Sequence, residues 1–441
     1  MARTTLGTME SGTRLSVGLL GCGNVGSALV RLLVDDAGRI ATRTGLRLDV
    51  VAVAVRSAAR ERDVDLPDGV VTTDAASVVS RPDIDLIVEV IGGIEPARTL
   101  ILAALKAGKP VVTANKELIA NCGSELWEAA ATAGVDLLFE ASVAGAIPLI
   151  RPLRESLAGE RIRRVMGIVN GTTNFILSRM SESGASYHDA LAEAQGLGYA
   201  ERDPTADVEG FDAAAKAAIL ANVAFGARVV AGDVYREGIS SITAADIAVA
   251  RRLGYALKLL AIVDQEDGPD GPVAVRVHPA MVPVTHPLAA VRDSFNAVFI
   301  EGDAAGQLML LGRGAGGMPT ASAVLGDLLD AAHNLTAGGA GRTVALHHVD
   351  LRPIDDLTLP YYLDLLVADR PGVLHAVSGV LGHHSVSVRS MEQEGVEGEG
   401  ARLVFVTHPA LERDVQACLH ELRGLDVVIR IDGMIRVIGA A

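Results

Sequence analysis

Three closely spaced glycines separate an apolar run from a helical pattern near the start of the chain. Residues Leu15–Leu20 are apolar, Gly21-x-Gly23-x-x-Gly26 follows at once, and Ala28–Leu33 has helical spacing. In such a strand–turn–helix unit the glycines allow a tight turn, a close approach of the backbone to a pyrophosphate, and close packing of the helix on the strand. The free N–H groups at the helix start then face the anion. The motif predicts a dinucleotide site with contacts from Gly21, Gly23, Asn24, Val25 and Gly26.

Further apolar runs alternate with helical stretches after this turn. Hydrophobic residues make up 49% of the chain and aromatic residues only 3%, so the cores must consist of Ala, Val, Leu and Ile, which suits strands buried on both faces. This alternation predicts an α/β unit, a Rossmann-type doubly wound parallel sheet. The predicted strands are Leu48–Val55, Leu86–Ile91, Pro110–Thr113 and Val135–Glu140.

The bulk properties exclude several classes of protein. The formal charge of −15 argues against binding to nucleic acid or to an anionic membrane. The three cysteines are scattered without metal-ligand spacing, which suggests a reducing compartment. Met1–Thr13 is polar and is interpreted as a flexible tail rather than a signal peptide, and no apolar run is long enough to span a membrane. We therefore expect a cytoplasmic protein that acts on a small molecule.

The end of the second predicted strand bears on the choice of cofactor. Leu48–Val55 is followed by Arg56, where an acid usually binds the ribose hydroxyl, and no acid occurs before Glu61. A guanidinium suits a 2′-phosphate, so the sequence favours NADP, with NAD still possible. The alternative is that Arg56 is only a solvated charge at a strand end.

Ionisable residues also occur where a hydrophobic core would avoid them. Thr113–Lys116 follows a predicted strand, at the edge where doubly wound sheets bind ligands. Asp212 and Lys216 are four residues apart, with alanines between them, and share a face if this segment is helical. They are either an exposed ion pair or part of a cleft. In a cleft, desolvation would lower the pKa of Lys216, which could act as acid or base in carbonyl reduction, and Glu201 and Asp207 would bind a substrate ammonium group.

The last eighty residues are predicted to form a separate unit after a linker that is rich in Gly, His, Asp and Pro. Their order is β-α-β-β-α-β, the ferredoxin-like arrangement. The predicted elements are a strand at Tyr361–Val367, a helix ending at Leu381, strands at Ser385–Glu394 and Arg402–Thr407, a helix at Leu411–Arg423 and a strand at Val427–Val437.

Several of these segments, in this order, resemble homoserine dehydrogenases over roughly residues 14 to 345. The Asn-Gly-Thr-Thr-Asn segment and the Asp-x₄-Asp-x₃-Lys spacing are far more specific than the glycine turn. Asp369-Arg370-Pro371-Gly372 in turn resembles ACT domains. The matching segments are Gly21–Gly26, Thr113–Lys116, Glu140–Pro148, Asn170–Asn174, Gly196–Pro204, Asp207–Lys216 and Gly314–Thr320.

The resemblance implies reversible hydride transfer between L-homoserine and L-aspartate 4-semialdehyde, within threonine and methionine biosynthesis. It implies that Lys216 is the proton donor or base, and that Lys116, between nicotinamide and substrate, assists. Gly316 would approach the nicotinamide. The residues implied to bind substrate or to order the lysines are Glu201, Asp207, Asp212, Thr173 and Gly198.

The family's monovalent-cation site is implied at the Glu140–Ile147 loop. Its ligands would be Glu140 and the backbone carbonyls of Val143, Gly145 and Ile147, and mostly neutral oxygens suit Na⁺ or K⁺ better than a transition metal. The alternative is a structural loop that binds no ion.

The ACT resemblance implies amino-acid binding between paired copies near Gly372, with threonine as the expected effector; the alternative is an assembly domain without a ligand. We expect a homodimer or homotetramer. Two other functions stay open. One is another ACT-tailed Rossmann dehydrogenase, for which the central motifs lack the expected histidine, and the other is a catalytically silent amino-acid sensor.

The expected division of the chain is a tail at 1–13, a dinucleotide-binding domain at 14–141 with a returning helix at 320–340, an α+β catalytic and dimerisation domain at 142–319, a linker at 341–359 and an ACT domain at 360–441.

Overall fold

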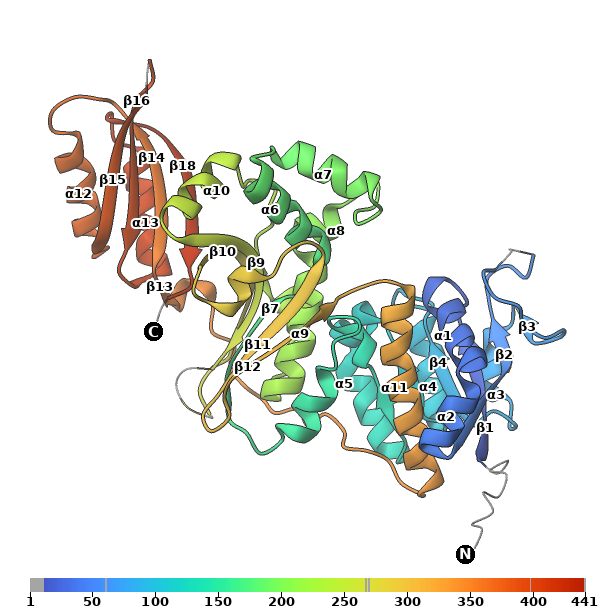
Figure 1. The fold of residues 1–441 in the computed structure, drawn as a ribbon. Helices are drawn as coiled ribbons and strands as arrows, with labels where there is room; N and C mark the ends of the chain where they lie inside the picture. Colours follow the sequence, from blue (N-terminus) through green and yellow to red (C-terminus); the bar gives the residue numbers. More distant parts are fainter. Residues whose placement is uncertain (1–11, 60–61, 266–267, 269, 397, 440–441) are drawn as a thin grey trace, which may run out of the picture.

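The computed structural model describes residues 12–59, 62–265, 268, 270–396 and 398–439. Figure 1 shows three units along the chain: an N-terminal unit in blue and teal, a central unit in green and yellow, and a C-terminal unit in orange and red. The expected tail lies outside the described residues up to residue 11. Its last residue, Thr13, already begins strand β1 (Thr13–Leu20), so the ordered sheet starts slightly earlier than the sequence suggested.

The N-terminal unit is a six-stranded parallel sheet in the order β3-β2-β1-β4-β5-β6. This confirms the Rossmann fold class, and the strand order reverses beside β1, where such sheets bind ligands. The strands are β1, β2 (Leu46–Ala54), β3 (Val71–Thr72), β4 (Leu86–Glu89), β5 (Val111–Thr113) and β6 (Leu137–Leu138); the helices are α1 (Asn24–Asp35), α2 (Ala37–Thr44), α3 (Ala75–Ser80), α4 (Ala97–Lys106) and α5 (Lys116–Ala133).

A helix from much later in the chain completes this unit. Helix α11 (Gly317–Thr336) lies beside α1, as the orange helix in front of the blue and teal unit shows (Figure 1). Its buried Val324 and Leu328 belong to the same apolar cluster as Leu29 and Leu33 of α1. The chain therefore returns to the N-terminal unit before it continues to the C-terminus.

The central unit packs helices on a mixed sheet, whose first strands run in the order β12-β11-β7-β9-β10. Helix α9 (Phe211–Phe225) is buried along residues 212–222 because alanines allow close packing on all its sides. The other elements are η1 (Glu140–Ser142), η2 (Pro152–Ser156), β7 (Ile162–Ile168), α6 (Gly171–Ser183), α7 (Tyr187–Gly196), α8 (Thr205–Val208), η3 (Ala231–Asp233), β8 (Tyr235–Arg236), α10 (Ala244–Arg252), β9 (Tyr255–Asp264), β10 (Ala274–Pro283), η4 (Pro287–Ala290), β11 (Phe295–Gly302) and β12 (Gly306–Arg313).

The C-terminal unit has the expected β-α-β-β-α-β order and the strand order β15-β16-β14-β18. It is not separate, however: β18 pairs in parallel with β10, so the central and C-terminal sheets are continuous. Its elements are η5 (Ile354–Asp356), β13 (Thr358–Leu359), β14 (Tyr361–Val367), α12 (Val373–His383), β15 (Val388–Val396), β16 (Gly400–Thr407), β17 (Ala410–Leu411), α13 (Glu412–Arg423) and β18 (Val428–Val437).

The expected linker is held against the central unit. Val344 and Leu346 pack on the large apolar core, and the His347 N–H donates to the Gly226 carbonyl at 2.7 Å. The Val273 N–H donates to the Asp350 carbonyl at 2.9 Å. Among the described residues, no helix is both long and apolar enough to cross a membrane.

Candidate active site

The glycine turn after β1 has the geometry that a bound pyrophosphate requires. Gly21 has φ +100°, and a Cβ there would lie 2.8 Å from the carbonyl oxygen of Val90. A Cβ at Gly26 would lie 2.3 Å from the Gly21 carbonyl oxygen, whereas a Cβ at Gly23 would meet nothing within 4 Å. Gly21 and Gly26 are thus needed for the turn itself, and Gly23 leaves open space at the start of α1, whose first N–H groups have no side-chain cap.

A cavity of about 650 Å³ opens beside this turn and extends to the end of β2. Gly21 and Gly23 line one side and Arg56 lines the other, as expected. Arg62, which sequence analysis did not single out, lines the cavity as well, and its guanidinium donates to the Ser57 carbonyl at 2.6 Å. Two guanidinium groups therefore lie where the adenosine half of a dinucleotide would bind.

A second cavity, of about 280 Å³, continues from the first, because Val90 and Ile91 line both. Lys116 and Lys216 line this cleft together with the Gly145 loop. Gly314 and Ala315 also line it, whereas Gly316 itself does not. The other lining residues are Val25, Gly92, Ala114, Asn115, Ala141, Ser142, Ala144 and Thr320.

The two lysines meet at one carboxylate. Lys216 Nζ lies 2.7 Å from Asp212 Oδ2, one turn earlier on α9, and Lys116 Nζ donates to the other oxygen of Asp212 from the start of α5. Asp212 and Lys216 are buried, whereas the Lys116 side chain is 47% exposed. The pair is therefore buried rather than exposed, with Lys216 lining the cleft and Asp212 behind it.

Burial and charge shift the pKa values of these groups. Burial lowers the pKa of Lys216, against the opposing effect of Asp212. For Lys116, burial acts downward, but the charge and hydrogen bond of Asp212 outweigh it and raise the pKa. Burial alone would raise the pKa of Asp212, yet the two lysines hold it well below its usual range. The cleft is thus lined by a buried amine whose pKa is lowered, and the carboxylate behind it stays ionised.

Asn170 connects this cluster to a second acid. Its amide donates to Asp207 Oδ1 at 2.7 Å and to Asp212 Oδ2 at 2.9 Å, while its own oxygen caps α6 by accepting from the Thr173 N–H at 2.9 Å. The cap fixes which way the amide points, so Asn170 holds both carboxylates in place. Asn170 belongs to the Asn-Gly-Thr-Thr-Asn motif, and its role was not predicted, although an asparagine before a helix is a capping signal.

Glu89 and Asn115 fix the loop that forms one wall of the cleft. The Glu89 carboxylate, fully buried at the end of β4, accepts from the Ile91 N–H at 2.7 Å and from the Thr113 hydroxyl at 2.6 Å. The Asn115 amide donates to the Gly93 carbonyl at 2.6 Å. These contacts link the loop after β4 to the segment before Lys116.

The loop at 140–147, where a cation is expected, has backbone carbonyl oxygens that accept no hydrogen bond from a described backbone amide. Gly145 has φ +57°, and a Cβ there would lie 2.4 Å from the Gly314 carbonyl oxygen, so the loop contacts the returning segment. None of the described backbone amides donates to the carbonyls of Val143, Gly145 or Ile147. The Glu140 carboxylate accepts N–H groups at the start of the following helix, from Ile150 at 2.7 Å among others. The backbone carbonyls of Val143, Gly145 and Ile147 fit a monovalent cation. The Glu140 side chain is not among these ligands, because its carboxylate accepts the N–H groups at 149–151.

In the C-terminal unit, Gly372 caps the start of α12 with φ +91° and is exposed, and a Cβ there would meet nothing within 4 Å. The turn is therefore open to solvent at a helix N-terminus.

Family models match three parts of the chain. The model described as "Homoserine dehydrogenase, NAD binding domain" matches residues 21–140, "Homoserine dehydrogenase" matches 148–329 and "ACT domain" matches 361–425. The homoserine dehydrogenase of Corynebacterium glutamicum is 50% identical over 428 residues and covers 96% of both chains. The homoserine dehydrogenase of Mycobacterium tuberculosis is 50% identical over 433 residues, 96% of this chain and 98% of its own.

Solved structures of homoserine dehydrogenases are also similar to this chain. A homoserine dehydrogenase from Thiobacillus denitrificans is 40% identical, covers 98% of this chain and 100% of its own, and superimposes with a TM-score of 0.90. A hyperthermophilic archaeal homoserine dehydrogenase, solved in complex with NADPH, is 30% identical, covers 75% of this chain and 100% of its own, and has a TM-score of 0.61.

The chain belongs to the homoserine dehydrogenase family. Its activity is that of an oxidoreductase that interconverts L-homoserine and L-aspartate 4-semialdehyde with a nicotinamide cofactor, and it carries an ACT domain. The expected family, fold class and enzyme class are thereby confirmed, and the silent-sensor alternative is set aside.

Not every residue that the resemblance implied lies at the cleft. Thr173 is buried, and its N–H and hydroxyl are both bound to Asn170. Glu201 is exposed, and its backbone carbonyl accepts from Gln195 at 3.0 Å. Gly198 lies in the turn after α7 with φ +77°. None of these three lines the 280 Å³ cleft, which brings together Lys116 and Lys216 with Asp212 behind them.

Proposed function

We propose that Lys216 is the acid–base group of the reaction and that Lys116 assists it. The observation that carries this proposal is the Lys116–Asp212–Lys216 cluster at the wall of the cleft. In the reductive direction the carbonyl oxygen of the semialdehyde takes a proton as hydride reaches its carbon. The nicotinamide supplies that hydride, or accepts it when homoserine is oxidised.

Lys216 is well placed to transfer this proton. Two of its three N–H bonds are directed to Asp212 Oδ2 and to the Val169 carbonyl at 2.6 Å. The third is left for the substrate oxygen in the cleft. Burial lowers the pKa of Lys216, which favours release of its proton compared with an ordinary lysine. Lys116, with a raised pKa, stays charged and stabilises negative charge that develops on that oxygen.

We propose that the acids behind the lysines, Asp207 and Asp212, bind the substrate's amino group. Asp207 is the better candidate, because Asp212 is already bound to both lysines. Asp207 lies on α8, half-buried, and Asn170 turns it toward Asp212. The roles implied for Glu201, Thr173 and Gly198 remain predictions. Those of Glu201 and Gly198 require the turn between α7 and α8 to contact the bound substrate, whereas Thr173 lies at the start of α6.

We infer a preference for NADP over NAD. Arg56 and Arg62 both line the adenosine cavity, and guanidinium groups there suit a 2′-phosphate. The archaeal relative solved with NADPH supports the same choice.

We also propose a monovalent cation at the 140–147 loop, Na⁺ or K⁺, held mainly by the carbonyls of Val143, Gly145 and Ile147. The left-over carbonyl oxygens support it. Because this loop contacts Gly314, a cation there would fix the returning segment beside the cleft.

For the C-terminal unit we propose that L-threonine binds near Gly372 and that copies of the chain pair as a homodimer or homotetramer. The open helix N-terminus suits the carboxylate of an amino acid. A cytoplasmic location and the domain division given above remain predictions.

Lys216→Ala tests the central proposal. We expect kcat to fall by about 10²–10⁴-fold in both directions, the usual effect of losing a positioned acid or base, with little change in NADPH binding. Lys106→Ala, at an exposed position on α4, is the matched control and should behave as wild type. A kcat for Lys216→Ala within a few fold of wild type would refute the assigned role.

A further inference from the structure

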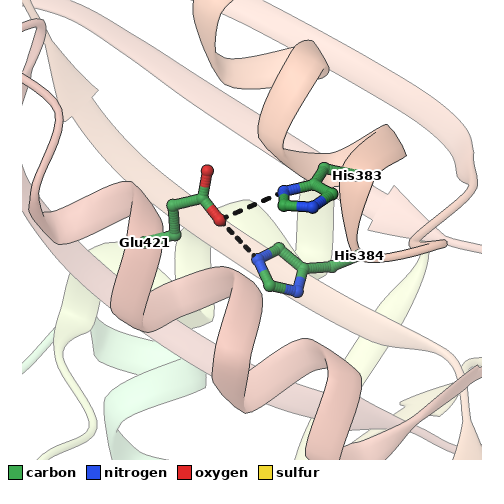
Figure 2. A group of neighbouring side chains, drawn as sticks. All are labelled: His383, His384 and Glu421. Atoms are coloured by element: carbon green, nitrogen blue, oxygen red, sulfur yellow. Dashed lines mark hydrogen bonds and ion pairs between the residues drawn. The ribbon is translucent and has the colours of Figure 1, made fainter.

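Two histidines and a glutamate lie close together in the C-terminal unit (Figure 2). His383 ends α12, His384 is the next residue, and Glu421 lies on α13. His384 Nε2 lies 2.7 Å from Glu421 Oε2, and His383 Nδ1 lies 3.4 Å from the same oxygen. The three ligand atoms lie within 4.8 Å of one another, and no other group of this kind occurs among the described residues.

A hydrogen bond between Glu421 and one histidine accounts for part of this arrangement. This hydrogen bond, at 2.7 Å, joins His384 at the end of α12 to Glu421 on α13. Ion pairs between exposed side chains contribute little to stability. A second imidazole on the same oxygen, with the two rings 5.0 Å apart, is therefore not needed to hold α12 against α13.

The spacing agrees with that of ligands around a small divalent ion. Zn–N and Zn–O bonds of about 2.0–2.2 Å place two ligands of a tetrahedron roughly 3.3 Å apart. The two distances from Glu421 Oε2, 2.7 and 3.4 Å, lie on either side of this value. The His383 side chain is 72% exposed, so its ring is free to rotate until the two nitrogens approach each other.

The chemistry of the ligands selects the metal. Neutral imidazole suits Zn²⁺, Cu²⁺ and Ni²⁺, whereas Mg²⁺ and Ca²⁺ prefer oxygen ligands alone. Three protein ligands on an exposed surface leave the remaining position to water. We propose that His383, His384 and Glu421 form a binding site for a divalent transition metal that joins the end of α12 to α13. The opposite end of α12 begins at Gly372, so the bound ion fixes the helix on which that turn lies.

Zinc binding by the untagged full-length protein tests the site. After treatment with a chelator, the protein is titrated with ZnCl₂ at pH 7.5 against a chromogenic zinc chelator and by calorimetry. We expect one high-affinity Zn²⁺ per chain. His383→Ala, His384→Ala and Glu421→Gln should each weaken binding at least tenfold, because even residues that only support metal ligands change affinity by about 10–100-fold.

His375→Ala is the matched control, since His375 is exposed on the same helix but outside the cluster, and it should bind Zn²⁺ as wild type does. His383→Ala keeps the test decisive if another variant misfolds, because this side chain is largely solvent-exposed; circular dichroism checks each fold. Lowering the pH to 5.5 should release the ion as protons compete for the imidazoles. Equal binding by wild type and the three cluster variants, or no binding by wild type, would overturn the proposal.

Discussion

Asp212→Asn removes the negative charge that two lysines share while keeping the size of the side chain. Lys216 Nζ lies 2.7 Å from Asp212 Oδ2, and the two residues are only 8% and 7% exposed. With an effective dielectric constant of about 20, two unit charges at this distance attract by roughly 6 kcal/mol. This is an upper limit for the loss, because the asparagine oxygen still accepts a hydrogen bond. The charged form of Lys216 loses this support, so its pKa, already lowered by burial, falls further.

The pH dependence of kcat in both directions measures this change. Reduction of the semialdehyde needs protonated Lys216, so its alkaline limb should move to lower pH. Oxidation of homoserine needs neutral Lys216, so its acidic limb should move the same way. At pH values above the shifted alkaline limb, reduction should suffer more than oxidation, by about 10²–10⁴-fold where the acid is fully lost.

The free energy of unfolding should also depend on pH through the lowered pKa of Lys216. The folded-state pKa of Lys216 lies below its unfolded value, so between the two values the unfolded chain binds the extra proton and the free energy of unfolding rises with pH. In Asp212→Asn this window extends to lower pH. Asp207→Asn is the comparison variant. Among the described residues Asp207 is hydrogen-bonded to Asn170 rather than to a lysine, and its charge is the weaker influence on Lys216, so its limbs should move less. Unchanged limbs in Asp212→Asn, or equal movement in Asp207→Asn, would refute the assignment of Lys216.

Other parts of the molecule give predictions of their own. Arg56→Ala should raise KM for NADPH several-fold and leave KM for NADH nearly unchanged, whereas Arg43→Ala, exposed on α2, is the control. An equal rise in KM for both cofactors would contradict the 2′-phosphate contact. Asn170→Ala removes two hydrogen bonds to carboxylates, each worth about 1.5–3 kcal/mol, so kcat/KM and the urea midpoint of unfolding should both fall. Asn121→Ala, at an exposed position on α5, is the control and should change neither. Gly372→Val places a β-branched residue at φ +91° in an open turn, so threonine inhibition should weaken while basal turnover persists; undiminished inhibition would place the effector elsewhere.

Local signals in the sequence predicted much of the site. The Gly21–Gly26 turn follows from the needs of a tight turn, and the structure shows the close approaches that exclude a side chain at Gly21 and Gly26. The four-residue spacing of Asp212 and Lys216 fixes their common helix face. Whether that face is buried depends on packing from α5, which lies about a hundred residues earlier, so spacing alone left the question open.

Residues whose role depends on distant partners were not predictable in this way. Asn170 was visible as a helix cap, but its amide meets carboxylates 37 and 42 positions later. Arg62 becomes part of the adenosine cavity only because the loop after β2 folds back toward the glycine turn. The pairing of β18 with β10 involves two residue pairs at the end of the chain, and no period in the sequence marks it.

That pairing places the C-terminal unit in contact with a segment of the central unit that leads to Asp207 on α8. Arg436 on β18 is buried and bonds Glu412 of α13 at 2.7 Å on one side, and it pairs with Glu237 of the central unit at 2.9 Å on the other. Glu237 begins the segment whose Ile239 N–H donates to the Val208 carbonyl, next to Asp207 on α8.

Packing in this segment is tight, since a Cβ at Gly238 would lie 2.4 Å from the same Val208 carbonyl oxygen. Cores packed to this density transmit small displacements rather than absorb them. We therefore expect a shift of β18 against β10 to move Asp207, and this expectation rests on the contacts named above. Deleting the whole C-terminal unit would also remove the partner of Glu237 and expose the edge of β10, so single substitutions in the effector turn separate regulation from catalysis more cleanly than a truncation.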